Sequence, residues 1–264
     1  MILTLTLNPS LDHTLVVESF TPGGRSEVER SSFEAGGKGV NVAQVLTMHE
    51  VPVRALMALG GPQGRQLAEM LTAAEVSVEV VEIAGDTRSN VTIEEPDGRL
   101  SRLSVAGPRV THKESDQIEE RLAELAIEAD WVVLAGSLPH GMGHTTYARL
   151  VESLRSVETK IAVDTSGPSL RAVLDVGADL LKPNVHELAE AVGAPIHTVA
   201  EALAAAESLR ARGTGAVLAS LGADGALLVD ATGQWLAQSP PVHVASSIGA
   251  GDSMVAGFLA HGGQ

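Results

Sequence analysis

The sequence contains no cysteine, few aromatic residues and few basic ones. Without cysteine there is no disulfide, no thiolate metal ligand and no cysteine nucleophile, which is compatible with the reducing cytoplasm where we expect the protein to work. Three Phe, two Trp and one Tyr provide no base-stacking platform. Because 33 acidic residues against 18 basic ones give a net charge of −15, which repels phosphate backbones, we expect no nucleic-acid partner.

Long apolar runs are missing as well. No segment approaches the roughly 18 residues of a membrane span, and the opening residues 1–5 lack the basic start of a signal peptide and are typical of a strand. We therefore expect no membrane partner. Apolar residues still make up 44% of the 264, enough for the buried core of one α/β domain with a small addition.

What remains is an alternation of short apolar strands with helices. Strands are predicted at 2–8, 130–136, 160–164, 179–182 and 216–220, and helices at 36–49, 63–75, 113–129, 145–156, 185–192 and 198–212. Two alternating segments, 90–95 and 99–105, flank Pro96-Asp97-Gly98 and predict a hairpin in a small separate sheet. Another hairpin is predicted at 225–230 and 234–237. This pattern predicts a doubly wound, mostly parallel sheet with helices on both faces.

Polar residues follow several of the predicted strands. In a doubly wound sheet, ligands bind at the carboxyl ends of the strands. The residues that fall there are Asn8, Asp12, Ser137, Asp164, Lys182, Asn184 and Ser220. We expect them to line one site rather than to serve solvation alone.

A glycine-rich turn, Gly249-Ala250-Gly251-Asp252, opens the last predicted helix. Its backbone N–H groups are free to converge on an anion, and Asp252 beside them can take a proton from a hydroxyl that attacks this anion. The alternative is an ordinary helix start, because Asp and Gly favour that position anyway. The third glycine of a dinucleotide fingerprint is missing, and no Walker motif occurs in the sequence.

A second glycine-rich turn, Gly36-Gly37-Lys38-Gly39-Val40-Asn41, also opens a helix. Its glycines allow backbone to approach a ligand, Lys38 offers a cation, and Asn41 can both donate and accept hydrogen bonds. The alternative is a flexible turn with a solvated lysine. Two such turns favour the two ends of one bisubstrate cleft.

Asn184 and Glu187 lie three residues apart at a predicted helix start, and therefore on one face. With water, their oxygens suit Mg²⁺ bound to a nucleotide phosphate. A helix-capping pair fits the same spacing equally well. The small residues of Ser220–Gly225 allow a nucleotide to pass close to the backbone, whereas the histidines show no metal-ligand spacing and are interpreted as surface or packing residues.

Five segments occur together in this order: Asn8-Pro9-Ser10-Leu11-Asp12, Gly36–Asn41, Gly136-Ser137-Leu138-Pro139, Lys182–Glu187 and Gly249–Asp252. The set resembles the PfkB family of ribokinase-like sugar kinases, in its phosphofructokinase and tagatose-6-phosphate kinase branch, from residue 1 to about residue 260. The resemblance implies one ribokinase-like domain over residues 1–264, with a small β-sheet lid drawn from about 14–34 and 87–105. Members usually continue further past the catalytic aspartate, through a helix pair that walls the adenine pocket, so we expect that part to be missing.

The resemblance also implies roles on the acceptor side. Asp252 would be the general base, and the amides of Gly249, Ala250 and Gly251 the anion hole for the transferred phosphoryl group. Asp12 and Asn41 would hold sugar hydroxyls, and Gly36, Gly37 and Lys38 would lie along the sugar phosphate. The substrate's own phosphate would meet Arg88 and Asn90, with Ser137 close by and Arg102 as a weaker candidate.

On the nucleotide side, the resemblance implies ATP and Mg²⁺ as cofactors. The residues that would line ATP are Lys182, Asn184, Ser220, Gly222 and Gly225. Glu187 would organise Mg²⁺ through water, with Asn184 beside it. The family further implies a homodimer formed through the lid.

The predicted function is ATP-dependent phosphorylation of a ketohexose phosphate, with fructose 1-phosphate, converted to fructose 1,6-bisphosphate, as the leading acceptor. Tagatose 6-phosphate and fructose 6-phosphate are alternatives, since cations on the lid do not tell where the substrate's phosphate sits. A non-catalytic sugar-phosphate-binding paralogue is the alternative from another class. The presence of Asp252 with its full turn argues against it, because a binder needs no base.

Overall fold

The computed structural model describes residues 1–238 and 249–263. Its main layer is a nine-stranded sheet in the order β13-β12-β11-β10-β9-β8-β1-β4-β5. The strands are β1 (Ile2–Thr6), β4 (Val53–Leu59), β5 (Ser77–Glu82), β8 (Trp131–Ala135), β9 (Lys160–Asp164), β10 (Leu180–Leu181), β11 (Ala216–Ser220), β12 (Ala226–Val229) and β13 (Gln234–Ala237). All neighbours from β5 to β11 are parallel, and β12 and β13 add an antiparallel edge. The predicted doubly wound, mostly parallel sheet is confirmed.

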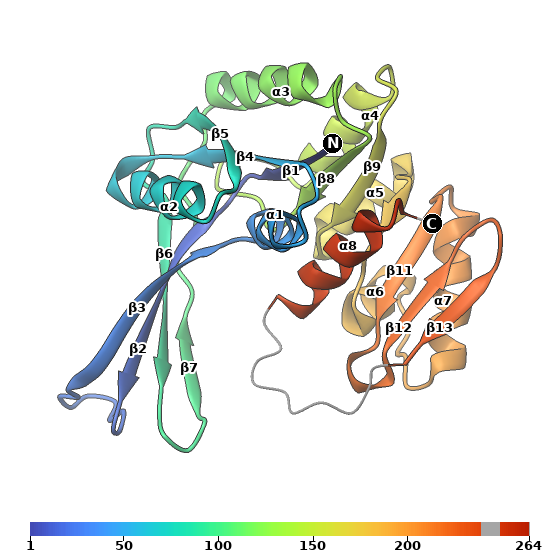
Figure 1. Ribbon diagram of the computed structural model, residues 1–264. Coiled ribbons are helices and arrows are strands. Elements are labelled where there is room, and N and C mark those ends of the chain that lie inside the picture. The colour runs from blue at the N-terminus through green and yellow to red at the C-terminus, as the bar shows by residue number, and fades with distance from the viewer. Residues whose placement is uncertain (239–248, 264) are drawn as a thin grey trace.

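Helices cover both faces of this sheet (Figure 1). One face is packed by α1 (Lys38–Met48), α2 (Gly61–Ala73) and α8 (Ala250–Ala260), and the other by α3 (His112–Ala126), α4 (Thr146–Leu154), α5 (Gly167–Val176), α6 (Val185–Val192) and α7 (Val199–Ala211). In β1, Leu3 and Leu5 pack on one side and Ile2 on the other. A strand buried on both faces needs apolar side chains at successive positions, which explains the continuous apolar runs in the sequence.

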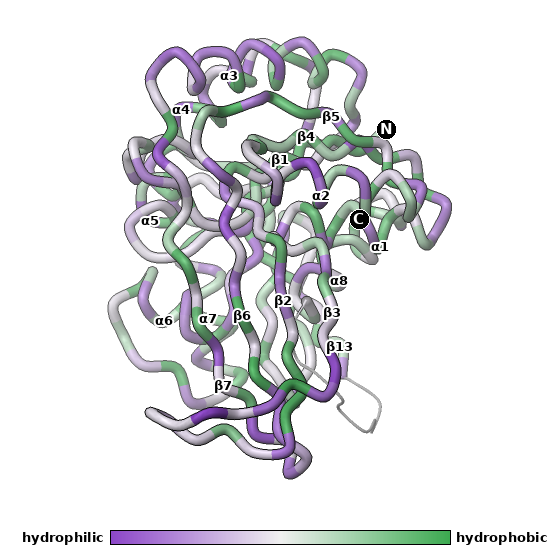
Figure 2. The backbone as a smooth tube through the Cα atoms, turned by 90° about the vertical axis from the view of Figure 1, so that its left-hand side faces the viewer, coloured by the Kyte–Doolittle hydropathy of each residue, from purple (hydrophilic) through white to green (hydrophobic). Residues whose placement is uncertain are grey.

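A second, four-stranded sheet projects from the main body in the order β3-β2-β6-β7 (Figures 1 and 2). Its strands are β2 (Ser10–Val17), β3 (Val28–Gly36), β6 (Arg88–Glu94) and β7 (Leu100–Leu103). The hairpin expected around Pro96-Asp97-Gly98 is the β6–β7 pair. Because β2 begins only four residues after β1 ends, the root of this sheet lies at the carboxyl end of β1. The small sheet thus forms one wall beside the strand ends.

No helix in the described ranges is both long and apolar enough to cross a membrane.

Gly39 allows α1 to pack closely on β1. A Cβ at this position would lie 2.5 Å from Thr6 Oγ1 and 3.0 Å from the Leu5 carbonyl oxygen. Since a packed core does not yield easily, we expect Gly39→Ala to lower the free energy of unfolding by about 1–3 kcal/mol. Urea denaturation measures the change. Gly257→Ala is the matched control, because nothing lies within 4 Å of its added Cβ, and it should stabilise α8 by up to about 1 kcal/mol. Equal effects of the two substitutions would contradict this packing.

Candidate active site

A cleft of about 1180 Å³ opens at the carboxyl ends of the central strands, beside the root of the small sheet. Its lining brings together both glycine-rich turns and the polar strand ends, as expected from the topology of the sheet. Seventeen of the predicted site residues line it: Asp12, Gly37, Lys38, Asn41, Arg88, Asn90, Ser137, Lys182, Asn184, Glu187, Ser220, Gly222, Gly225, Gly249, Ala250, Gly251 and Asp252. Residues for which the sequence predicts no role also line it, among them Thr6, Ser166 and His186.

Two predicted residues, Gly36 and Arg102, are not part of this lining. Gly36 ends β3 behind Asp12, and a Cβ there would lie 2.3 Å from Asp12 Oδ2, so its role is to leave room for that carboxylate. Arg102 is exposed on β7 opposite Thr92. Because β7 pairs only with the outer part of β6, away from Arg88, the structure does not bring Arg102 together with Arg88, and the role of Arg102 at the substrate phosphate stays a prediction.

Asp252 lies buried in the first turn of α8, with 6% of its surface exposed. Gly249 precedes the helix in the left-handed conformation, with φ of 73°, which favours glycine. The first N–H groups of a helix have no partner within it, so the amides of this turn are available to an anion beside the carboxylate. Burial raises the pKa of Asp252, and a 2.7 Å hydrogen bond from Asn41 Nδ2 to Oδ2 opposes that shift.

The turn before α1 supplies Lys38 and Asn41. Gly37 has φ of 128°, and a Cβ on it would lie 2.9 Å from Thr6 Cγ2, so this tight turn requires glycine. Asn41 was expected to hold a sugar hydroxyl. In the structure its amide donates to Asp252, which gives Asn41 the further role of orienting that carboxylate.

Asp164, at the end of β9, joins two lysines. Its Oδ1 lies 2.6 Å from Lys38 Nζ and its Oδ2 lies 3.2 Å from Lys182 Nζ. Only 1% of Asp164 and 5% of Lys182 are exposed. Burial lowers the pKa of Lys38, but the carboxylates of Asp164, Glu187 and Asp252 together outweigh burial, and the pKa ends above its ordinary value. The sequence predicts Asp164 at a strand end but predicts no role for it. The signal that could have found it is an acidic residue at the end of an otherwise apolar strand.

The small sheet contributes a linked set of polar groups. Asp12 Oδ1 accepts hydrogen bonds from Ser10 Oγ at 2.7 Å and from Asn90 Nδ2 at 2.8 Å. Arg88 donates through one terminal nitrogen to the Asn8 carbonyl oxygen at 3.0 Å. These bonds restrict the positions of the carboxylate and of the guanidinium, both of which line the cleft.

Arg88 has hydrogen-bond donors that are not paired within the described residues. Its Nε is buried and has no hydrogen-bond partner within residues 1–238 and 249–263, and burial lowers the pKa of its guanidinium. Asn8, which accepts from Arg88, donates through Nδ2 to Ser137 Oγ at 3.0 Å. This chain connects the small sheet to the turn after β8.

Asn184 and Glu187 form a capping box at the start of α6. Asn184 Oδ1 accepts from the amides of His186 and Glu187, and Glu187 Oε2 accepts from the amide of Asn184 at 2.8 Å. The capping alternative is therefore present. Both lone pairs of the Asn184 oxygen are used in this box, and the place of Asn184 beside Mg²⁺ stays a prediction. The other Glu187 oxygen lies 3.6 Å from Lys38 Nζ.

The turn after β11 forms a backbone wall of the cleft. Gly222 and Gly225 have φ of 62° and 99°. A Cβ on Gly225 would lie 2.0 Å from the Ala237 carbonyl oxygen, so glycine is required where the turn packs against β13. Side chains are thus kept out of the space that the sequence predicts for a nucleotide.

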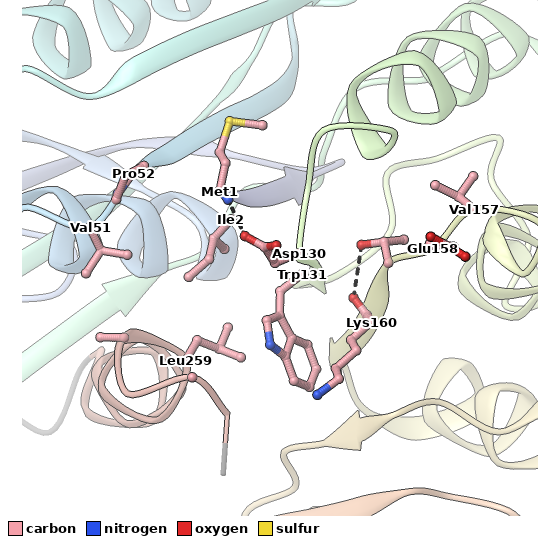
Figure 3. A pocket seen from close by; sticks show the side chains of 13 residues that line it. Met1, Ile2, Val51, Pro52, Asp130, Trp131, Val157, Glu158, Lys160 and Leu259 are labelled. Carbon is pink, nitrogen blue, oxygen red and sulfur yellow. Dashed lines mark hydrogen bonds and ion pairs between the residues drawn. The ribbon is translucent and has the colours of Figure 1, made fainter.

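A different pocket, of about 650 Å³, lies at the amino ends of the strands (Figure 3). There the terminal ammonium group pairs with Asp130, and Lys160 Nζ lies 5.4 Å from the centre of the Trp131 ring. None of the predicted site residues lines it. The chemistry-bearing residues are therefore gathered at the carboxyl end of the sheet.

Two helix-start turns, a buried carboxylate and two lysines around one cleft suit the transfer of a phosphoryl group between two anionic substrates. Together with the doubly wound sheet and its small side sheet, they define a ribokinase-like sugar kinase. The chain belongs to the pfkB family of carbohydrate kinases, whose family model matches residues 5–261. The fold class and the family predicted from the sequence are confirmed.

Curated relatives and solved structures agree with this membership. The 1-phosphofructokinase of Bacillus subtilis is 37% identical over 98% of this chain and 85% of its own length. The 1-phosphofructokinase of Haloferax volcanii is 41% identical over 98% of this chain and 83% of its own. The structure of phosphofructokinase-2 from Escherichia coli in complex with fructose-6-phosphate covers 99% of this chain and 87% of that one, with a TM-score of 0.92 and 33% identity.

Proposed function

We propose that the protein transfers the γ-phosphoryl group of ATP to a hydroxyl of fructose 1-phosphate, forming fructose 1,6-bisphosphate. The observation that carries this proposal is the buried Asp252, oriented by Asn41 and set beside the amides of the Gly249–Gly251 turn at the start of α8. This arrangement combines a base with an anion site at one point. Two curated relatives named for this reaction support the choice of acceptor.

The geometry supports a role for each group. Asp252 accepts the proton of the attacking hydroxyl, while the turn amides stabilise charge on the transferred group. Asp12 and Asn41 hold sugar hydroxyls, while Arg88 and Asn90 meet the phosphate that the acceptor already carries. Binding and orientation thus provide most of the catalysis, as is general for phosphoryl transfer.

ATP fits the half of the cleft formed by Lys182, Ser220 and the glycine turn of Gly222 and Gly225. For Mg²⁺, the described residues offer no cluster of three acidic or histidine side chains. The donor set instead fits an ion held mainly by phosphate oxygens and water, with Glu187 binding one of its waters. When bound, Mg²⁺ would neutralise phosphate charge. Use of ATP is consistent with the cytoplasmic location that we propose.

Fructose 6-phosphate is the second candidate acceptor, because the solved relative was obtained with that sugar phosphate. A panel of ATP with fructose 1-phosphate, fructose 6-phosphate and tagatose 6-phosphate, followed by ADP release, distinguishes them. We expect kcat/KM to be at least tenfold higher for fructose 1-phosphate. A higher kcat/KM for one of the other two sugar phosphates would make that sugar phosphate the acceptor. If none of the three is phosphorylated but calorimetry shows that a sugar phosphate binds, the protein is a non-catalytic binding protein.

The rate should depend on pH through Asp252. The carboxyl is a base only when deprotonated, so kcat/KM falls as pH drops through its pKa, which burial places above the ordinary value for aspartate. The hydrogen bond from Asn41 lowers that pKa. We therefore expect Asn41→Ala to move the acid limb of the kcat/KM profile to higher pH. An acid limb that stays at the same pH or moves to lower pH would show that Asn41 does not lower the pKa of the base.

We further propose that the small sheet is a lid through which two copies of the chain associate. One row of side chains crosses all four strands, from Phe33 through His13 and Val91 to Leu103. Phe33 and Leu103 are 41% and 57% exposed, and the rings of His13 and Phe33 stack at 4.1 Å. An exposed apolar row on a sheet favours burial against a second copy.

Sedimentation of Leu103→Asp tests this association. The wild type should sediment as a dimer and Leu103→Asp as a monomer, because a carboxylate would be buried in the interface. Leu100→Asp is the matched control: Leu100 is 47% exposed and opposite Glu94, on the other face of the sheet. Dimers of both variants, or a monomeric wild type, would refute this interface.

A further inference from the structure

Asp164 forms ion pairs with two lysines that line the cleft, Lys38 and Lys182. Its backbone is fixed in the sheet, where it pairs with Ala135 of β8 and its carbonyl oxygen accepts from the Gly136 amide at 2.9 Å. Its side chain is almost completely buried, and each carboxylate oxygen faces a different lysine. A rigid carboxylate therefore contacts two of the cations that line the cleft.

Lys182 is held against the phosphoryl-transfer turn. A Cβ on Gly251 would lie 2.8 Å from Lys182 Nζ, so the ammonium group is in contact with the turn whose amides receive the anion. The sequence assigned Lys182 to ATP in general. Contact with this turn points to the γ-phosphate end of ATP as the part that Lys182 meets.

Lys38 extends from the acceptor side. It begins α1, the helix that also carries Asn41 and thereby contacts the base Asp252. Its side chain is one-third exposed and lines the cleft, so the side chain remains partly accessible to a bound substrate. Lys182 therefore approaches Asp164 from the ATP side of the cleft, and Lys38 from the acceptor side.

We propose that Asp164 is a positioning residue for the transfer step, holding Lys182 at the Gly249–Gly251 turn and Lys38 on the acceptor side. The inference rests on the proposed function and deepens it. A lysine side chain has many rotamers, and an ion pair to a fixed carboxylate selects one for each lysine before the substrates arrive. Asp164 thus acts through the lysines and contacts neither substrate.

This role predicts a separation of kcat from ATP affinity. The carboxylate repels the phosphates of ATP while it orients the lysines. Asp164→Asn removes both effects, so ATP binding should stay within threefold of the wild type or become tighter, while kcat falls by about tenfold to a hundredfold, the range of a lost charged hydrogen bond. Lys182→Met, by contrast, should weaken ATP binding at least tenfold.

The test compares the wild type, Asp164→Asn, Lys182→Met and the double variant. Calorimetry measures ATP binding in the absence of acceptor, steady-state kinetics gives kcat and KM, and thermal unfolding reports stability. Tyr147→Phe is the control for a change beneath the site, because Tyr147 is fully buried and its hydroxyl donates to the Ala135 carbonyl oxygen. It should leave kcat and ATP binding within threefold.

In the Lys182→Met background, Asp164→Asn should reduce kcat by clearly less than in the wild type, because one of the two lysines it positions is gone. If the loss of kcat in the double variant equals the product of the losses in the two single variants, the inference is overturned. A kcat of Asp164→Asn within threefold of the wild type would also overturn it. A tenfold loss of ATP binding in folded Asp164→Asn would also overturn it. If the wild type phosphorylates no acceptor, the proposed function fails, and the calorimetry still decides whether Asp164 supports or opposes ATP binding.

Discussion

Replacing Asp252 by asparagine should reduce turnover by about 10²–10⁴-fold, the usual contribution of a positioned general base. Asparagine has nearly the same shape and can still bond to Asn41, but it cannot accept the proton of the attacking hydroxyl. The affinity for the acceptor should stay within threefold, because the base acts on a proton that leaves only in the transition state. Coupled detection of ADP gives kcat, and calorimetry with fructose 1-phosphate gives the affinity.

The matched control for this variant is Asp175→Asn. Asp175 forms an exposed ion pair with Arg212 at 3.2 Å, and such pairs contribute little to stability. Asp175→Asn removes one carboxylate from a position outside the cleft lining, so the turnover of this variant should equal that of the wild type. An Asp252→Asn enzyme that retains more than a third of wild-type turnover would refute the assignment of the base.

Arg88→Ala should weaken binding of the phosphorylated acceptor by about 10- to 150-fold. This range corresponds to about 1.5–3 kcal/mol for hydrogen bonds to a charged group. Arg88 lines the cleft. Its two terminal nitrogens donate to the Val105 and Asn8 carbonyl oxygens, and since each carries two N–H groups, the guanidinium retains donors for a phosphate. Fructose without phosphate lacks this contact, and its affinity should change by less than threefold.

Arg102→Ala serves as the control for Arg88→Ala. It removes the same charge from the same sheet, but Arg102 is exposed and lies outside the cleft lining. Calorimetry with fructose 1-phosphate and with fructose separates the two arginines. Equal losses for the two sugars with Arg88→Ala would show that Arg88 does not meet the phosphate. A larger loss with Arg102→Ala would return that residue to the site.

The sequence predicted the location of the site better than its internal contacts. The strand ends and both glycine turns were recognisable because parallel strands bring their carboxyl ends to one edge, and the cleft indeed collects them. Spacing along the chain, however, does not tell which side chains pair. Lys38 was expected along the sugar phosphate, whereas its ammonium group is in an ion pair with Asp164, a residue 126 positions away in the sequence.

Parts of the fold were also beyond the sequence pattern. Helix α5 was not anticipated, because its ten residues begin at Gly167 and Pro168 and resemble a loop. The resemblance implied Arg102 as a weaker candidate for the phosphate, and only the register shows that β7, which carries it, pairs with the outer part of β6. For Asn184 and Glu187, capping and metal binding need the same spacing, and only the hydrogen bonds of the folded chain show that the capping box is formed.

Phosphorus NMR of the purified protein with ATP, Mg²⁺ and fructose 1-phosphate tests most directly whether Asp252 and its turn transfer a phosphoryl group to this sugar phosphate. The account predicts that the γ-phosphate signal of ATP disappears while a second phosphomonoester signal, that of fructose 1,6-bisphosphate, grows at the same rate, and that Asp252→Asn suppresses both changes. Release of inorganic phosphate without bisphosphate, or equal rates for the wild type and Asp252→Asn, would contradict it.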